Sequence, residues 1–254
     1  MKILVVGGGG REHAIVWKIA QSPKVDKIYC APGNGGIAEL AECVDIATTD
    51  IENMVKFAKD NAIDLVMVAP DDPLVLGMVD AMEKEGIRAF GPRANAAIIE
   101  GSKAFSKELM KKYNIPTANY EVFTDSTSAI DYIKAQNTFP TVIKADGLAL
   151  GKGVIIAQNL EEAEQAVHEM IDDGKFGKSG SRVVIEEFLT GPEVSVLAFT
   201  DGKTVKPMVS AQDHKRAYDN DEGLNTGGMG TFSPSRLYDC LLYTSPSPRD
   251  RTRS

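Results

Sequence analysis

The 254-residue chain has few cysteines, no long apolar run and no excess of positive charge. Its three cysteines form no CxxC pair, and an odd number provides no disulfide framework. The first apolar run, residues 3–6, is too short for a signal peptide or a membrane span, so we expect a cytoplasmic protein without membrane contact. A formal net charge of −8 argues against a nucleic-acid partner.

The first hundred residues alternate short apolar runs with helical patterns. Glycine or proline bounds the runs, which is typical of buried parallel strands. We expect these strands at residues 3–6, 27–31, 64–69 and 88–90. Helical patterns cover residues 12–20 and 74–85, the second opened by Asp72-Pro73 as cap and first helical residue. The predicted fold class is α/β, with an N-terminal doubly wound parallel-sheet domain at residues 1–102.

After Gly101 the order of elements changes. Residues 102–113 have an amphipathic helical pattern, and a clear helix covers residues 160–173 with Asn159 as its cap. Strands are expected at residues 141–145, 153–157, 182–187 and 193–199. This order predicts a small α+β subdomain with an antiparallel hairpin. Residues 237–254 have no apolar period, and their composition is typical of a disordered tail.

Four consecutive glycines, residues 7–10, follow the first strand and open the first helix. Backbone N–H groups at such a turn favour an anion. The candidates for binding a substrate phosphate are Gly8, Gly9, Gly10, Arg11 and Glu12. The GxGxxG fingerprint is not met, because Glu12 occupies the third glycine position, and this disfavours a nicotinamide-dependent oxidoreductase. A purely structural tight turn is the alternative.

The glycine-rich segment at residues 144–154 looks like a P-loop with two defects. Gly147 and Gly151 are one residue too close, and Gly153 stands where a P-loop has Ser or Thr. The segment also leads into a strand rather than a helix. A hairpin of this kind can fold over a triphosphate as a lid, with Lys144 and Lys152 meeting the phosphate charge. The alternative is a surface hairpin whose lysines are solvated.

Two carboxylates near the end of the next strand suit an adenosine. Glu186 is placed to accept a hydrogen bond from the adenine amino group, and Glu193 to hold the ribose hydroxyls. The backbone of Leu189 lies between them and can serve the edge of the ring. Either glutamate alone is explained by a solvated strand end, but the pair together with the lysine-flanked hairpin favours a nucleotide.

Lys103, Lys144, Glu186 and Glu193 lie in segments that resemble the ATP-grasp fold. Four further motifs narrow the resemblance: GGGREHA at residues 8–14, APGN at 31–34, DHKR at 213–216 and NTGGMG at 225–230. Together, over residues 1 to about 234, they closely resemble the phosphoribosylamine–glycine ligase family. So many separate motifs in the same order are strongly specific.

The resemblance implies a reaction among ATP, glycine and 5-phosphoribosylamine through a glycyl phosphate, giving glycinamide ribonucleotide, ADP and phosphate. It also implies an ATP-grasp lid region at residues 103–191 and the start of a central subdomain at 192–236. The ATP-binding residues it implies are Lys103, Lys144, Gly147, Gly151, Lys152, Gly153, Glu186, Leu189 and Glu193. The catalytic residues it implies are Asp213, Lys215 and Arg216, beside a substrate loop of His214, Asn225, Thr226, Gly227, Gly228, Met229 and Gly230. For residues 213–216 a surface loop with solvated charges is the alternative.

One departure from the family bears on activity. The family implies Mg²⁺ or Mn²⁺ held by a Glu…Glu-x-Asn set that does not occur in this sequence, so we expect no metal ligand in this chain. We therefore expect the chain to be inactive or nearly so. The segment after about residue 236 does not resemble the family, so we expect it to be foreign, and we expect the protein to be a monomer. Two other functions stay open: a non-catalytic module that binds ATP or a phosphoribosyl group, and a sister ATP-grasp enzyme such as a carboxylase.

Overall fold

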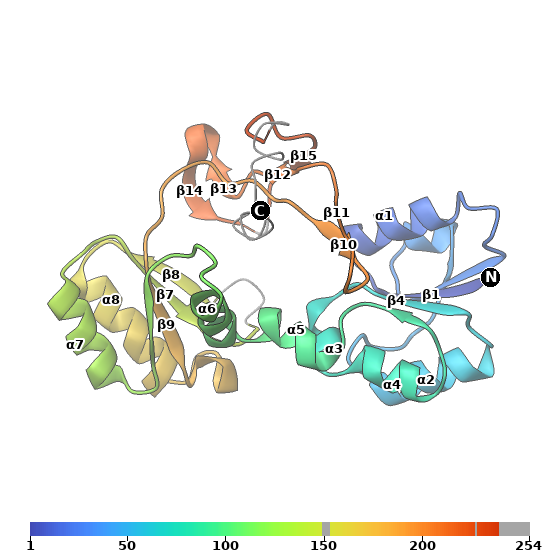
Figure 1. Cartoon of the computed structure of the whole chain (residues 1–254), viewed down its shortest axis with the longest axis horizontal. Coiled ribbons are helices and arrows are strands. Elements are labelled where there is room, and N and C mark those ends of the chain that lie inside the picture. The colour runs from blue at the N-terminus through green and yellow to red at the C-terminus, as the bar shows by residue number, and fades with distance from the viewer. Residues whose placement is uncertain (149–152, 227, 239–254) are drawn as a thin grey trace, which may run out of the picture. The chain divides into compact units, whose positions relative to one another are not determined.

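The computed structural model describes residues 1–148, 153–226 and 228–238, and it divides into two compact units. The first unit comprises Met1–Phe188 and the second Leu189–Ser254. Figure 1 shows the elements of both units coloured along the chain. The domain boundaries expected at residues 102, 191 and 236 stay predictions, since a division at Phe188 does not test them.

Five parallel strands form the N-terminal sheet in the order β3-β2-β1-β4-β5. These strands are β1 (Lys2–Gly7), β2 (Lys27–Pro32), β3 (Glu42–Cys43), β4 (Leu65–Val68) and β5 (Ala89–Phe90). The helices are α1 (Gly10–Ile19), α2 (Ile51–Asp60), α3 (Asp71–Val75), α4 (Met78–Lys84) and α5 (Ala94–Gly101), with a 3-10 turn at Ile37–Glu39. The predicted parallel sheet is confirmed, and β3, α2 and α5 are additions to the predicted elements.

The central strand β1 is buried on both of its faces. Leu4 and Val6 belong to a hydrophobic cluster with residues of α2 and α4. Ile3 and Val5 belong to a second cluster with residues of α1 and β2. Successive side chains of a strand point to opposite faces, so an unbroken apolar run requires helices on both sides of the sheet. The doubly wound layering thus follows from the composition of β1.

The single helix predicted at residues 74–85 is wrong. The chain forms α3 and α4 instead, separated by Gly77, whose φ of 88° lies in the left-handed region. Asp72 is also not the cap, because α3 already begins at Asp71, after Pro70. A glycine that adopts a positive φ ends a helix whatever the apolar pattern around it, and here that local preference overrides the periodicity.

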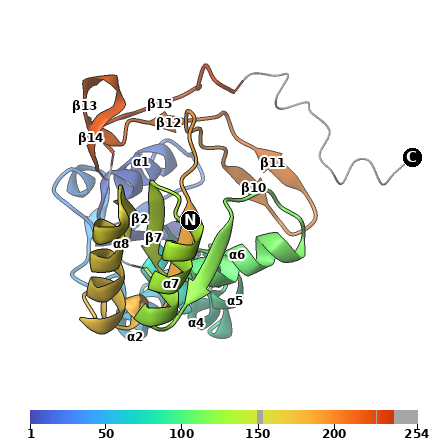
Figure 2. The ribbon, with the colours of Figure 1, turned by 90° about the vertical axis from the view of Figure 1, so that its left-hand side faces the viewer.

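The second sheet of the first unit is antiparallel, in the order β6-β9-β7-β8. Its strands are β6 (Tyr120–Phe123), β7 (Thr141–Ala145), β8 (Val154–Ala157) and β9 (Val183–Glu187). Helices α7 (Ser126–Gln136) and α8 (Leu160–Val167) pack side by side against one face, as Figure 2 shows. A π-helical turn, His168–Asp172, continues α8 to within one residue of the end predicted for that helix, residue 173, and α6 spans Lys103–Lys112. The predicted antiparallel hairpin is the β7–β8 pair.

The described residues of the second unit, 189–226 and 228–238, form three two-stranded pairs, β10–β11, β12–β15 and β13–β14. Their bounds are β10 (Ala198–Thr200), β11 (Val205–Pro207), β12 (Gln212–Asp213), β13 (Arg216–Tyr218), β14 (Glu222–Asn225) and β15 (Thr231–Phe232). The strand predicted at residues 193–199 is wrong in extent, because only its end joins β10 and Ser195 forms an isolated bridge to Ala211. Among the described helices of the chain, none has the length and apolarity that crossing a membrane requires.

The burial of Leu4 predicts a large cost for truncating it. Leu4 is 0% exposed, whereas Leu76 is 57% exposed. We expect Leu4→Ala to lower the free energy of unfolding by about 2–5 kcal/mol, because it removes buried methyl groups and leaves a cavity. Leu76→Ala, the matched control, should cost less than about 1 kcal/mol. Urea unfolding followed by circular dichroism measures both, and equal costs would show that β1 is not the centre of the core.

Candidate functional site

The four-glycine turn joins β1 to α1 and contacts the end of β2. A Cβ atom on Gly8 would lie 2.6 Å from the carbonyl oxygen of Gly33, so only glycine fits there. The Asn34 side chain donates to the Gly8 carbonyl at 2.9 Å, and the Gly33 N–H donates to the Gly7 carbonyl at 3.1 Å. The turns at the ends of two neighbouring parallel strands are therefore one hydrogen-bonded structure.

The Glu12 carboxylate caps the start of α1. Glu12 is 5% exposed, and its Oε2 accepts from the Gly9 N–H at 2.7 Å while Oε1 accepts from Arg11 Nε at 3.2 Å. A carboxylate at a helix N-terminus stabilises the helix and uses one of its free N–H groups. The Gly10 backbone and the exposed Arg11 are thus the members of this predicted set best placed to meet an external phosphate.

The order of the strands locates this turn within the fold. β2 and β3 are added on one side of β1 and β4 and β5 on the other, so the strand order reverses at β1. In open α/β sheets, ligands bind outside the carboxyl ends of the strands at this point of reversal. The glycine turn lies at the carboxyl end of β1, where the topology favours a ligand.

Lys144 and Glu186 share one face of the four-stranded sheet. Val142 pairs with Glu186, and Lys144 pairs with Val184, so the two charged residues are diagonal neighbours on β7 and β9. Intervening residues such as Ile143 and Ile185 pack towards α7 and α8. Lys144 Nζ lies 3.0 Å from Glu186 Oε2. The structure therefore brings these two predicted residues together on the face opposite to α7 and α8.

A second lysine, from α6, reaches the same carboxylate. Lys107 Nζ is also 3.0 Å from Glu186 Oε2, and the side chains of both residues are less than 10% exposed. Lys107 Nζ donates further to Thr117 Oγ1 at 2.8 Å and to the Ala118 carbonyl at 3.3 Å. One buried carboxylate is thus shared by two ammonium groups.

The buried carboxylate of Asp146, just after β7, holds the start of α6. Its Oδ1 accepts from the Ala104 N–H at 2.7 Å and from Ser102 Oγ at 3.0 Å, and Ser102 is itself the N-cap of α6. Arg182, just before β9, donates to Asp146 from Nε at 2.9 Å and from Nη2. The Asp146 carbonyl accepts from the Lys103 N–H at 3.0 Å. Helix α6 is thereby fixed to the ends of two strands.

Lys103, the first residue of α6, contacts the glycine-rich segment that follows β7. Its Nζ donates to the Gly147 carbonyl at 2.9 Å. Burial lowers the pKa of Lys103, and the neighbouring Lys144 lowers it further, against the opposing effect of Asp146, Glu100 and Glu186. A half-buried cation whose hydrogen bond among the described residues goes to a backbone carbonyl is suited to receive an anionic ligand.

The remaining residues predicted to bind ATP are not all described. Gly153 belongs to the described part, and its carbonyl accepts from the Ala145 N–H at 2.8 Å, which closes the hairpin. Gly151 and Lys152 lie outside the described residues. Leu189 and Glu193 belong to the second unit, where Leu189 is 65% exposed and Glu193 pairs with Lys215.

In the second unit the two predicted substrate segments are hydrogen-bonded to each other. The Thr226 N–H and Oγ1 both donate to the Lys215 carbonyl, at 2.6 and 2.9 Å, and the Met229 N–H donates to the His214 carbonyl at 2.7 Å. Asn225 is the register partner of Arg216, whose Nη1 donates to the Gly223 carbonyl at 2.7 Å.

Three charges gather at Lys215 in this unit. Its Nζ pairs with Glu193 and lies 3.9 Å from Asp213 Oδ2, and the hydrogen bond to Glu193 raises the pKa of Lys215. The N–H of His214 donates to the Gly230 carbonyl, and the Gly228 N–H donates to Thr226 Oγ1. Gly227 lies outside the described residues. The predicted catalytic and loop residues that are described therefore form one local cluster.

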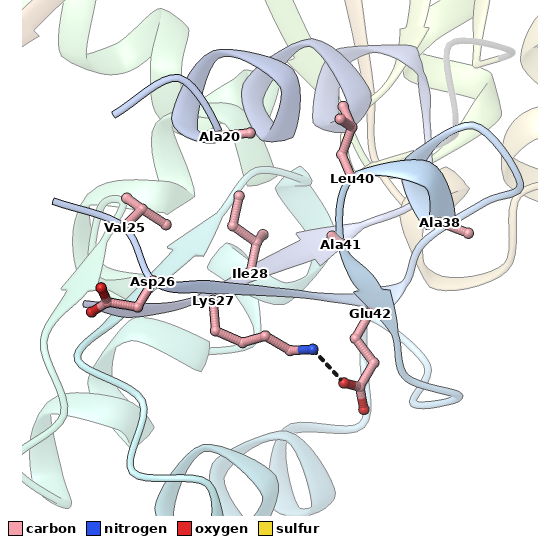
Figure 3. A pocket seen from close by; sticks show the side chains of 9 residues that line it. All are labelled: Ala20, Val25, Asp26, Lys27, Ile28, Ala38, Leu40, Ala41 and Glu42. Carbon is pink, nitrogen blue, oxygen red and sulfur yellow. Dashed lines mark ion pairs between the residues drawn. The ribbon is translucent and has the colours of Figure 1, made fainter. Parts of the chain in front are cut away.

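One cavity of the N-terminal sheet is lined by none of the predicted site residues. This cavity of about 450 Å³ lies beside β2 and β3, with the Lys27–Glu42 ion pair at 2.8 Å among its lining residues, as Figure 3 shows. In the described part of the chain, no group of three or more His, Cys, Asp or Glu side chains is arranged to hold a metal ion.

Sequence reasoning missed Lys107, Asp146 and Arg182. Lys107 is one of several lysines in a basic amphipathic helix, and no spacing rule separates a buried lysine from its exposed neighbours. Asp146 lies two residues after Lys144 in the glycine-rich segment. It accepts hydrogen bonds at the start of α6, which lies about 40 residues earlier in the chain, and no local sequence pattern marks a contact of this range. Ser102 before the helix at residues 103–112 was the available signal, because serine is a preferred N-cap.

Asp146→Ala tests whether this carboxylate holds the site together. The substitution leaves Arg182 and the Ala104 N–H without their partner, so we expect a loss of roughly 1–3 kcal/mol in the free energy of unfolding. The matched control is Asp131→Ala, which removes an exposed carboxylate from α7 and should change stability by less than about 0.5 kcal/mol. Urea unfolding measures both, and an unchanged midpoint for Asp146→Ala would contradict the assignment.

Comparisons with known proteins agree with the motifs. Residues 1–100 match the model of the phosphoribosylglycinamide synthetase N domain, and residues 101–242 match that of its ATP-grasp (A) domain. The phosphoribosylamine–glycine ligase of Halalkalibacterium halodurans is 56% identical over 234 residues, which are 92% of this chain and 54% of that protein.

Solved structures agree as well. The crystal structure of phosphoribosylamine–glycine ligase from Thermotoga maritima has a TM-score of 0.78 at 32% identity, covering 92% of this chain and 56% of that one. The biotin carboxylase domain of Hydrogenobacter thermophilus 2-oxoglutarate carboxylase, solved with MgADP, has a TM-score of 0.70 at 18% identity. It covers 86% of this chain and 51% of that one, and it supports the fold alone.

The family models and the structural match confirm the ATP-grasp resemblance inferred from the motifs. The chain spans about half the length of the curated relatives that it matches. Because the two models together match residues 1–242, this chain belongs to the phosphoribosylglycinamide synthetase family.

Proposed function

We propose that this chain provides the ATP-binding part of a ligase that joins glycine to 5-phosphoribosylamine. The observation that carries the proposal is the arrangement of Lys103, Lys144 and Glu186 beside the glycine-rich hairpin. Two ammonium groups next to glycine backbone N–H groups suit a polyphosphate, and a carboxylate on the same face of the sheet suits the adenine.

The triphosphate is assigned to the two lysines. Lys144 is 28% exposed and pairs with a carboxylate that a second lysine also contacts, so it can turn to a phosphate without leaving Glu186 unpaired. Lys103 is held by a backbone carbonyl. Gly147, Gly151, Lys152 and Gly153 are assigned to the phosphates with these two lysines in this proposal.

The adenosine is assigned to Glu186, Leu189 and Glu193. Both contacts recorded for the Glu186 carboxylate in the described part of the chain use Oε2, which leaves Oε1 for the adenine amino group. Glu193 would bind the ribose hydroxyls in exchange for its contact with Lys215. The Leu189 backbone would then serve the ring edge.

The other substrates are assigned to the remaining predicted residues. The phosphate of 5-phosphoribosylamine meets the turn at Gly8, Gly9, Gly10 and Arg11, with Glu12 as the cap that holds the turn. Lys215 and Arg216 supply anion contacts, and Asp213 supplies a contact for an amine. The substrate loop is assigned to His214 and to Asn225, Thr226, Gly227, Gly228, Met229 and Gly230, of which Thr226 is hydrogen-bonded to Lys215 and Asn225 is the register partner of Arg216.

The chemistry follows from the poor reactivity of a carboxylate. A glycine carboxylate oxygen attacks the γ-phosphorus of ATP, ADP leaves, and an acyl phosphate forms. The amine of 5-phosphoribosylamine then attacks the carbonyl carbon, the bond to the phosphate oxygen breaks, and the amine loses a proton. Phosphoryl transfer depends mainly on positioning and charge neutralisation, which the lysines supply. Divalent cations, Mg²⁺ above all, add charge neutralisation at the phosphates, and the described residues offer no cluster to hold them.

Lys144→Met tests the assignment of the phosphate. We expect the Kd for ATP to rise by roughly tenfold or more, because one charge-assisted contact to a phosphate is lost. Lys134→Met is the matched control, since Lys134 lies on α7 and pairs with Glu164 away from the site. Isothermal titration calorimetry on the 254-residue chain measures both, and an unchanged Kd in Lys144→Met would refute the assignment.

The reaction itself is tested with a chimera. Residues 1–234 of this chain are joined to the remaining half of the H. halodurans ligase, and ADP release is measured with each substrate omitted in turn. Release that requires both glycine and 5-phosphoribosylamine supports the ligase. Release that requires bicarbonate instead indicates a carboxylase of the same fold, and ATP binding without turnover indicates a non-catalytic module.

A further inference from the structure

Three oxygens of the protein surround the ammonium group of Lys107. Its Nζ donates to Thr117 Oγ1 at 2.8 Å and to the Ala118 carbonyl at 3.3 Å, and it pairs with Glu186 Oε2 at 3.0 Å. Its side chain is 8% exposed. Lys107 is therefore satisfied entirely by the protein, unlike the more exposed Lys144.

Lys144 and Lys107 contact the same oxygen of Glu186 but differ in what holds them. Lys144 Nζ has Glu186 as its recorded partner among the described residues, and its side chain is 28% exposed. Lys107 comes from α6 and is held by two further oxygens of the segment that follows this helix. Of the two cations, Lys144 is the one that can leave.

A buried carboxylate without a partner is strongly disfavoured. If Glu186 had Lys144 as its sole cation, a nucleotide phosphate could recruit Lys144 only by leaving Glu186 unpaired at 6% exposure. The contact with Lys107 removes that cost, because Glu186 keeps a charged partner at the same oxygen.

We propose that Lys107 is a positioning residue for nucleotide binding, which keeps Glu186 paired and oriented while Lys144 moves from Glu186 to a nucleotide phosphate. This inference rests on the proposed ATP-binding function. It assigns Lys107 no contact with the nucleotide, since its buried ammonium group is held by two hydrogen bonds and one ion pair within the protein.

The test is ATP binding by the 254-residue chain and its Lys107→Met variant, measured by isothermal titration calorimetry. Without Lys107, Lys144 is retained by Glu186, so we expect the Kd for ATP to rise about tenfold, the equivalent of one charge-assisted hydrogen bond. Lys107→Arg should restore most of the affinity. Lys111→Met, an exposed lysine one turn further along α6, should leave the Kd within about twofold.

A double-mutant cycle separates positioning from a merely structural role. If Lys107 acts by releasing Lys144, Lys107→Met should change the Kd by less than about twofold when Lys144 is already methionine. A structural role would weaken binding equally in both backgrounds, and that result would overturn the inference.

Thr117→Val covers the case in which Lys107→Met does not fold. It keeps both charges and removes one hydrogen-bond acceptor of Lys107, so we expect a rise in Kd of roughly threefold that disappears in the Lys144→Met background. An unchanged Kd in the folded Lys107 and Thr117 variants would overturn the inference alone. Absence of ATP binding by the unaltered chain would overturn the proposed function as well, and the inference with it.

Discussion

The candidate nucleotide site depends on the buried carboxylate of Asp146. This one group joins α6, which carries Lys103 and Lys107, to the ends of β7 and β9, which carry Lys144 and Glu186. The pairing of β7 with β9 brings Lys144 to Glu186, and the lysines of α6 are added to them because the start of this helix is tied to the ends of the two strands. A carboxylate shared by a serine, an arginine and a backbone N–H fixes direction as well as distance.

Asp146 and Glu12 have the same physical role in the two sheets of the first unit. Each is a buried carboxylate beside a glycine-rich turn, and each accepts hydrogen bonds at the start of a helix. Glycine allows the close approach that a turn needs, but it supplies no side chain to fix the conformation. A nearby buried acid compensates by holding the backbone N–H groups in place.

Features that depend on residues close together in the sequence could be predicted, whereas features that depend on contacts between distant segments could not. Unbroken apolar runs predicted β1, β2 and β4, because burial on both faces leaves a local trace. The helix at residues 74–85 was predicted as continuous since its apolar pattern runs through Gly77, and the positive φ there becomes visible only in the structure. Lys144 and Glu186 were found from motifs, whereas Lys107 was not, because its burial arises from the packing of α6 against β9.

The position of Trp17 gives this chain a built-in fluorescent reporter on a single helix. It is the single tryptophan of the sequence, it lies on α1, the helix that begins at the four-glycine turn, and its side chain is 58% exposed. Excitation of indole in preference to tyrosine therefore gives emission from α1 alone, and the four-stranded sheet and its helices contribute no tryptophan emission. A change in this emission therefore reports on α1 without an attached dye, whereas the site of Lys103 and Lys144 contains no indole that would emit.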